Sequence, residues 1–137
     1  MGQPFVIQLD NRPGELAHVT RALANRGINL LHIAGSSAGR SMCAMLATDD
    51  DRATREVLRS MGIPFVEGDT LHLEVEDRPG AVASLSEQLA AAGVNITGVL
   101  IVGRRGTTCE IAFTVDDEAK AREALGLPQV HSLAGSR

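Results

Sequence analysis

The chain has 137 residues and a formal net charge of −4, and its basic residues are scattered along it. It contains no Trp or Tyr and only three Phe, so it lacks the basic surface and the aromatic stacking platforms of nucleic-acid-binding proteins. No segment approaches the roughly 18 apolar residues that a membrane span needs, and no signal-peptide pattern opens the sequence. We therefore expect a cytoplasmic location.

A loop followed by a helix occurs twice along the chain. The stretch NRPGELAHVTRALANRGINL, residues 11–30, has a near copy in DRPGAVASLSEQLAAAGVNI, residues 77–96. The halves align without a gap as far as the second helix of each, which we expect to be two residues shorter in the second copy. This repeat predicts two domains, 1–68 and 69–137. Because a domain of about 65 residues is marginal alone, we expect the halves to share an interface.

The first half shows a strand, a helix, two strands, a helix and a strand in chain order. Apolar residues at helical spacing, such as Val19 and Leu23, mark the first helix. The run Asp49-Asp50-Asp51 is interpreted as the cap of the second helix, which Gly62 is expected to end. The predicted elements are strand 5–9, helix 14–26, strand 29–35, a turn at 38–40, strand 42–48, the helix after Asp51, and strand 64–67.

The second half repeats this order with strand 71–75, helix 81–92, strand 95–102, a turn at 104–106, strand 109–115, helix 117–125 and strand 130–133. The order βαββαβ predicts the α+β class and two ferredoxin-like units. Each unit is expected to be a four-stranded antiparallel sheet with two helices on one face. This topology places the strand after the first helix at an edge of its sheet.

The two predicted edge strands, 29–34 and 95–102, carry few charges although their outer backbone groups lack a partner. We therefore expect the units to pair side by side, edge to edge, into an eight-stranded antiparallel sheet with four helices on one face. Strands 29–34 and 42–48 also carry apolar residues on both faces, so the face without helices has to be covered as well. This pattern predicts a homodimer.

The repeated loop runs from a strand through N/D-R-P-G straight into a helix. We expect Pro13 and Pro79 near the first helical turn, and Gly14 and Gly80 where a side chain would obstruct a ligand. The N–H groups that follow would lie at the positive end of the helix dipole and form a seat for a carboxylate. The alternative is an ordinary turn and helix cap, in which the Asn or Asp of the loop holds the free N–H groups.

Each of these helices is followed by a second short pattern, Gly27-Ile28-Asn29 and Gly93-Val94-Asn95. It places an amide side chain at the start of the edge strand, although Gly-x-Asn is also simply a good helix exit. The joint pattern D/N-R-P-G-x-L/V and, about thirteen residues later, G-I/V-N-I/L resembles the ACT domain family, and it occurs in both halves. The chain is similar to a tandem ACT protein with no attached catalytic domain.

The resemblance implies a regulatory module that senses a small molecule, most often an amino acid. In such modules the ligand lies where the first loop of one ACT unit meets the edge strand of its neighbour. The loop and edge-strand asparagines correspond to amides that hold serine in the serine-sensitive dehydrogenase type. That type has a His two residues before the loop Asn, where this chain has Leu9 and Val75, so serine specificity is not supported.

The resemblance implies the same ligand-binding positions in both halves. The exchange of Asn11 for Asp77 is the one chemical difference at corresponding loop positions, so the two sites need not bind alike. The implied positions are Asn11, Arg12, Pro13, Gly14, Glu15, Leu16, Asn29 and Leu30 in the first half, and Asp77, Arg78, Gly80, Ala81, Val82, Asn95 and Ile96 in the second.

An enzyme is the rival class, and we predict that the chain is not one. Its histidines, at positions 18, 32, 72 and 131, share no metal-ligand spacing, and neither Cys has a neighbouring His. We therefore expect no metal, no cofactor and no catalytic residue, although His32 on an edge strand could face a ligand. Cys43 and Cys109 align between the copies and are interpreted as small core residues. A third class is a module that docks on an unidentified regulated protein through its apolar sheet face.

Overall fold

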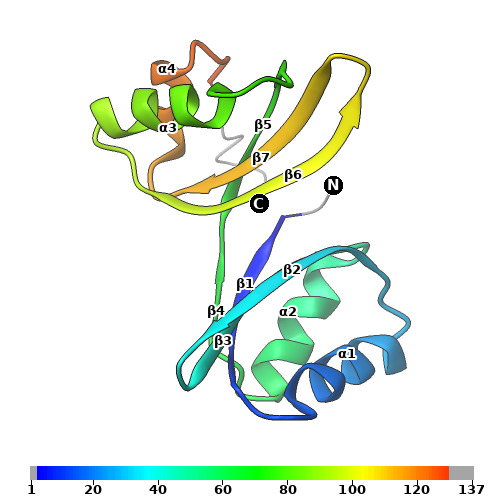
Figure 1. Ribbon diagram of the computed structural model, residues 1–137. Coiled ribbons are helices and arrows are strands. Elements are labelled where there is room, and N and C mark those ends of the chain that lie inside the picture. The colour runs from blue at the N-terminus through cyan, green and yellow to red at the C-terminus, as the bar shows by residue number, and fades with distance from the viewer. Residues whose placement is uncertain (1–2, 130–137) are drawn as a thin grey trace, which may run out of the picture. The chain divides into compact units, whose positions relative to one another are not determined.

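The structure of the chain is a computed structural model that describes residues 3–129. The chain forms two compact units, the first ending at Gly68 and the second beginning at Asp69. Each unit has its own sheet, its own pair of helices and its own apolar core (Figure 1).

The first unit is a four-stranded antiparallel sheet with the order β2-β3-β1-β4, and both of its helices lie on one face (Figure 1). This is the predicted ferredoxin-like arrangement, and β2 lies at the predicted edge. Its elements are β1 Phe5–Asp10, α1 Glu15–Asn25, β2 Leu30–Ala38, β3 Ser41–Thr48, α2 Asp51–Ser60 and β4 Phe65–Glu67.

The second unit repeats the arrangement, with the strand order β5-β7-β6 and β6 at an edge. The predicted strand 130–133 lies outside the described residues. The elements of this unit are β5 Asp69–Glu76, α3 Ala81–Ala91, β6 Ile96–Arg105, β7 Thr108–Val115 and α4 Glu118–Ala124. The two units therefore confirm the α+β class, whereas the pairing of the two edge strands stays a prediction.

Strand alternation explains the core of each unit. Phe5, Ile7 and Leu9 face the helices and are buried, whereas Gln8 between them is exposed. On β7, Ile111 and Phe113 take the same inward positions and are fully buried. The helices contribute apolar side chains at helical spacing, so that each sheet face and each helix stripe bury one another.

The four helices within residues 3–129 end in the same way, which explains why their boundaries can be predicted from the sequence. After α1, Gly27 adopts φ 71°, its N–H donates to Ala24 O, and Ile28 N–H donates to Leu23 O at 3.1 Å. This is a Schellman motif, which needs glycine at the left-handed position and an apolar residue after it. The pairs Gly62-Ile63, Gly93-Val94 and Gly126-Leu127 end the other three helices with the same two hydrogen bonds.

The second copy contains one residue more than the first between its first helix and its hairpin turn. Both edge strands have a bulge near their start, at Leu31 and at Thr97, but only β6 has another at Val102. As a consequence β6 extends to Arg105, and the turn lies at residues 106–107 instead of 104–106. The expectation of a gap-free alignment up to the second helix is therefore wrong.

The extra residue also breaks the equivalence of the two cysteines. Leu9 pairs with Met42, and its counterpart Val75 pairs with Cys109, so Cys109 occupies the place of Met42. Cys109 is buried in the core, as predicted, whereas Cys43 lies on the opposite face of its sheet and is exposed. The interpretation of Cys43 as a core residue is therefore wrong, because a shift of one residue exchanges the faces of a strand.

The last helix is also shorter than predicted. Helix α2 has 10 residues and α4 has 7, a difference of three rather than two. The bulge accounts for this, because it delays the start of α4 by one position relative to the first copy.

Candidate functional site

The R-P-G segment of each loop forms a tight turn in front of its helix. Glu15 N–H donates to Arg12 O at 3.4 Å, and Gly14 has φ 89° and ψ −12°. These are the dihedrals of the third residue of a type II turn, a position that favours glycine, with proline favoured one residue earlier. The second loop repeats the turn, with Gly80 at φ 91°. Proline therefore lies directly before the N-cap glycine of each helix, near the first helical turn as predicted, and a positive φ explains the glycine.

The turn leaves the N-termini of α1 and α3 without a side-chain cap. Within residues 3–129, no backbone carbonyl outside α1 accepts from the N–H groups of Leu16 and Ala17, and the same holds for Val82 and Ala83 in α3. Of the N–H groups that were expected to be free, those of Glu15 and Ala81 are used by the turn, whereas those of Leu16 and Val82 have no such acceptor among the described residues. These ends are open positive poles of helix dipoles.

The other two described helices, α2 and α4, are capped. Asp50 accepts from Ala53 N–H at 3.0 Å at the start of α2, and Asp117 accepts from Lys120 N–H at 3.1 Å at the start of α4. This confirms the cap predicted from the aspartate run, and identifies Asp50 as the residue that provides it. The contrast shows that the helices after the repeated loop differ from the other two in leaving their N-terminal donors open.

The first residue of each loop holds the hairpin instead of the helix. Asn11 Nδ2 donates to Gly39 O at 3.0 Å, and Asp77 Oδ2 accepts from Arg104 Nε at 2.9 Å. The backbone N–H groups of both residues donate to the same hairpins. The alternative in which Asn11 and Asp77 cap the helices is therefore wrong.

The loop arginines lie in solvent beside acidic neighbours. Arg12 is paired with Asp10 at 3.1 Å and with Glu15 at 2.8 Å, and its side chain is 66% exposed. Arg78 is paired with Glu76 at 3.0 Å. Both guanidinium groups are therefore paired with carboxylates at the surface.

The apolar positions of the implied site are divided between core and surface. Leu16 and Leu30 pack against the first core and Ile96 against the second, so these side chains stabilise the fold. Val82 on α3 is 40% exposed. A hollow of about 280 Å³ lies beside the second loop and is lined in part by Arg78 and Ala81.

Asn29 and Asn95 lie at the start of the edge strands, as predicted, and are held through their backbones. Asn29 N–H donates to Asp49 Oδ1 at 2.9 Å, and its carbonyl accepts from Asp49 N–H. Asn95 makes the same two bonds with Asp116. Both asparagine side chains are exposed. Sequence reasoning missed these two aspartates, although the Asp-Asp pair that follows the third strand of each unit was a usable signal.

A single unit does not bring its loop and its asparagine together. Asn11 is bound to Arg40 at the start of β3, whereas Asn29 is bound to Asp49 just past the end of β3. Seven steps along this strand amount to about 24 Å. The two halves of the implied site therefore lie at opposite ends of one sheet.

The rival enzymatic residues form no metal site within the part of the chain that the structure describes, where no three His, Cys, Asp or Glu side chains are close enough to hold an ion. His131 lies outside that part. His72 Nδ1 is 3.1 Å from Glu110 Oε1, and His32 pairs with Ala47 on the open face of the first sheet. None of the described helices has the length and apolar character for crossing a membrane.

Comparisons with known proteins agree with this fold. Residues 5–61, which lie within the first unit, match the model of the ACT domain family. No curated protein sequence matches the chain.

Among solved structures, protein BT0572 from Bacteroides thetaiotaomicron is similar, with a TM-score of 0.71 and 22% identity over 91% of this chain and 86% of that one. The regulatory subunit of aspartate kinase from Thermus flavus has a TM-score of 0.63 and 22% identity over 90% and 89% of the two chains. The ligand-free regulatory subunit from Thermus thermophilus has a TM-score of 0.59 and 18% identity over 92% of each. These likenesses support the fold of both units.

Proposed function

We propose that the chain is a regulatory sensor that binds an amino acid and is not an enzyme. The ligand carboxylate accepts from the free N–H groups at the start of α1 or α3, and the exposed Asn29 and Asn95 side chains supply the remaining polar contacts. The observation that carries this proposal is the contrast between helices. The chain caps α2 and α4 with aspartate and leaves open the two helices that follow the repeated loop.

Antiparallel pairing of edge strands would complete each site. In such a pair the start of one strand lies beside the end of the other. The end of β2 at Ala38 leads into the hairpin that holds Asn11, so a neighbouring edge strand would bring its own asparagine to this loop. In the eight-stranded sheet expected from the sequence, this neighbour would be the other unit of the same chain.

The two loops favour different ligands or different affinities. Asn11 is neutral and donates to a carbonyl, whereas Asp77 is an acid held by Arg104. A carboxylate beside a zwitterion favours its ammonium end and repels its carboxylate end, and the arginine reduces both effects.

Apolar side chains at the edges favour a second candidate function, docking on a partner protein. Ile33 and Val99 are 45% and 50% exposed although they pair with the buried Leu46 and Phe113 on the core face of each sheet. Homodimerisation and a cytoplasmic location remain part of the proposal. A light-scattering mass equal to one chain at micromolar concentration would argue against the dimer.

Thermal shift against the individual proteinogenic amino acids tests the proposal. A ligand at a hundredfold excess over Kd stabilises the native state by about 2.7 kcal/mol, which is easily measured. Asn29→Ala with Asn95→Ala should remove the part of the shift that comes from binding at the helix termini without unfolding the protein, because both residues bind Asp49 and Asp116 through their backbones. Asn25→Ala, at the exposed end of α1, is the matched control and should retain it.

The chemical form of the ligand provides a further check. Amino acid amides, which lack the carboxylate, should not raise the melting temperature. If no amino acid raises it in the unmodified protein, the docking function takes precedence. If the asparagine variants respond as fully as the unmodified chain, the edge-strand amides do not bind the ligand.

A further inference from the structure

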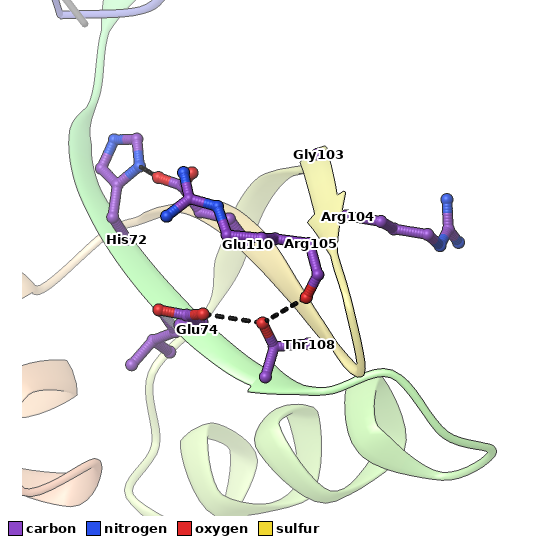
Figure 2. A pocket seen from close by; sticks show the side chains of 8 residues that line it. His72, Glu74, Gly103, Arg104, Arg105, Thr108 and Glu110 are labelled. Atoms are coloured by element: carbon purple, nitrogen blue, oxygen red, sulfur yellow. Dashed lines mark hydrogen bonds and ion pairs between the residues drawn. The ribbon is translucent and has the colours of Figure 1, made fainter.

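The open face of the second sheet, opposite the helices, contains a hollow of about 360 Å³. Its polar lining comes from β5, β6 and β7 and consists of His72, Glu74, Arg104, Arg105, Thr108 and Glu110 (Figure 2). Alternation along the strands explains the lining, because the neighbouring Leu71, Cys109 and Ile111 point into the core.

The same face of the first unit carries none of these charges. The β-ladders match His72 with Val6, Glu74 with Gln8, Glu110 with Cys43 and Arg105 with Ala38. Both units build the same fold, so the charged set is not required for folding. Its presence in only one copy points to a binding role for that face.

The hollow contains an acid and a base that are not paired with each other. His72 Nδ1 lies 3.1 Å from Glu110 Oε1, and these two groups hold one another. Thr108 Oγ1 lies 2.7 Å from Glu74 Oε1 and 3.0 Å from Arg105 O, but its single proton serves only one of them at a time. Neither Glu74 nor Arg105 has an ion-pair partner among the residues that the structure describes.

The bulge that is unique to β6 shapes the hollow. Val102 is unpaired, and Gly103 then lies opposite Glu110 without a side chain. A Cβ atom added at Gly103 would meet nothing within 4 Å, so the wall is open at this point. Figure 2 shows the Arg105 side chain reaching over the hollow toward His72 and Glu110, while Arg104 points away from it.

We propose that this hollow binds a small zwitterion of the amino acid type. Arg105 receives the carboxylate through its planar guanidinium, and Glu74 receives the ammonium group. One negative and one positive group without ion-pair partners among the described residues match a ligand that carries one of each. The volume lies at the lower end of the range for small-molecule sites, which suits a ligand of this size. The site is separate from the helix termini and does not depend on the function proposed for them.

Counterpart exchanges provide the test. Arg105→Ala and Glu74→Gln each install the residue that the first unit has at the same place, so the fold should tolerate them. Single proteinogenic amino acids are titrated into the full chain while the backbone amide signals of Gly103 and Thr108 are followed by NMR. At least one amino acid should move both signals, and either exchange should weaken that binding by at least about tenfold.

Two controls separate this site from other causes. Arg104→Gln alters the adjacent arginine, which points away, and should leave the affinity unchanged. Asn29→Ala with Asn95→Ala removes the amides of the proposed sensor site and should also leave it unchanged. The N-acetyl and amide forms of the same amino acid, which each lack one charge, should bind at least about tenfold more weakly. Signals that stay unmoved by every amino acid, or binding that survives both counterpart exchanges, would overturn the proposal.

Discussion

The sign of φ, and not free space, should decide how the glycines of the second unit tolerate a side chain. Gly80 and Gly103 are both open, since an added Cβ would meet nothing within 4 Å at either position. Gly80 has φ 91° in its turn, whereas Gly103 in β6 has no positive φ. Alanine at these two positions therefore changes the backbone energy in opposite directions within the same unit.

Two opposing effects determine how much each substitution changes the free energy of unfolding. Alanine in the left-handed region costs about 1–2 kcal/mol, and it stiffens the unfolded chain by about 0.4–1 kcal/mol at any position. Gly80→Ala should therefore lower the free energy of unfolding by about 1 kcal/mol. Gly103→Ala stiffens the unfolded chain without the cost of a left-handed alanine, so it should raise the free energy of unfolding by about 0.4–1 kcal/mol.

Urea unfolding followed by circular dichroism measures both variants, and an unchanged m-value shows that the native and unfolded states are still the same. Gly14→Ala repeats the test in the first loop, where φ is 89°. Equal shifts of the same sign at Gly80 and Gly103 would refute the assignment of the loop glycine to a left-handed turn position.

Three further predictions concern buried polarity, pH and the bulge. Thr54→Val leaves the buried Thr48 hydroxyl without its 2.7 Å partner and should lower the free energy of unfolding by about 1–3 kcal/mol, whereas the double variant with Thr48→Val should lose less than the sum of the two singles. The hydrogen bond from Arg26 holds the pKa of Glu56 below its usual value of 4.5. The associated stabilisation is therefore present above pH 4.5 and lost as the pH falls through the lowered pKa, and Arg26→Gln should raise the pKa of Glu56 in an NMR titration. Deletion of Val102 should leave the pairing of β6 with β7 intact, which cross-strand NOEs between Gly103 and Glu110 would check.

Most of the fold was predictable because the signals that define it are local. A Gly-apolar pair ends every helix, and aspartate opens two of them, so the boundaries agree with prediction to within a residue or two. The longest disagreements are the three additional residues at the ends of β2 and of β6, and the bulge at Val102 accounts for one of those in β6.

The bulge at Val102 was not predicted because the two halves can also be aligned without it. The first unit has three consecutive aspartates and the second has two, so two alignments that differ by one residue both pair Asp with Asp. The chance match of Cys43 with Cys109 favours the incorrect one. Only the strand pairing, in which Cys109 takes the place of Met42, distinguishes them.

The positions of the loops and asparagines of the candidate site were predictable, but the hydrogen-bond partners of the loop residues were not. Sequence spacing locates the loops and the edge-strand asparagines, because both belong to local patterns. Whether Asn11 caps the helix or holds the hairpin depends on Gly39, which lies far along the chain. A tertiary contact of this kind leaves no periodic signal in a single sequence.

Two adjacent arginines show how the second copy has diverged without losing the fold. Alternation along β6 directs Arg104 toward Asp77 and Arg105 over the hollow. The first unit has Ser37 and Ala38 at these positions, and its loop residue Asn11 is neutral. The acid in the second loop and the arginine that pairs with it are therefore absent together from the first copy. On one side of β6, Arg104 brings a positive charge to the second loop, and on the other side Arg105 brings one to the open face of the sheet. The charge of both surfaces therefore depends on these two adjacent residues.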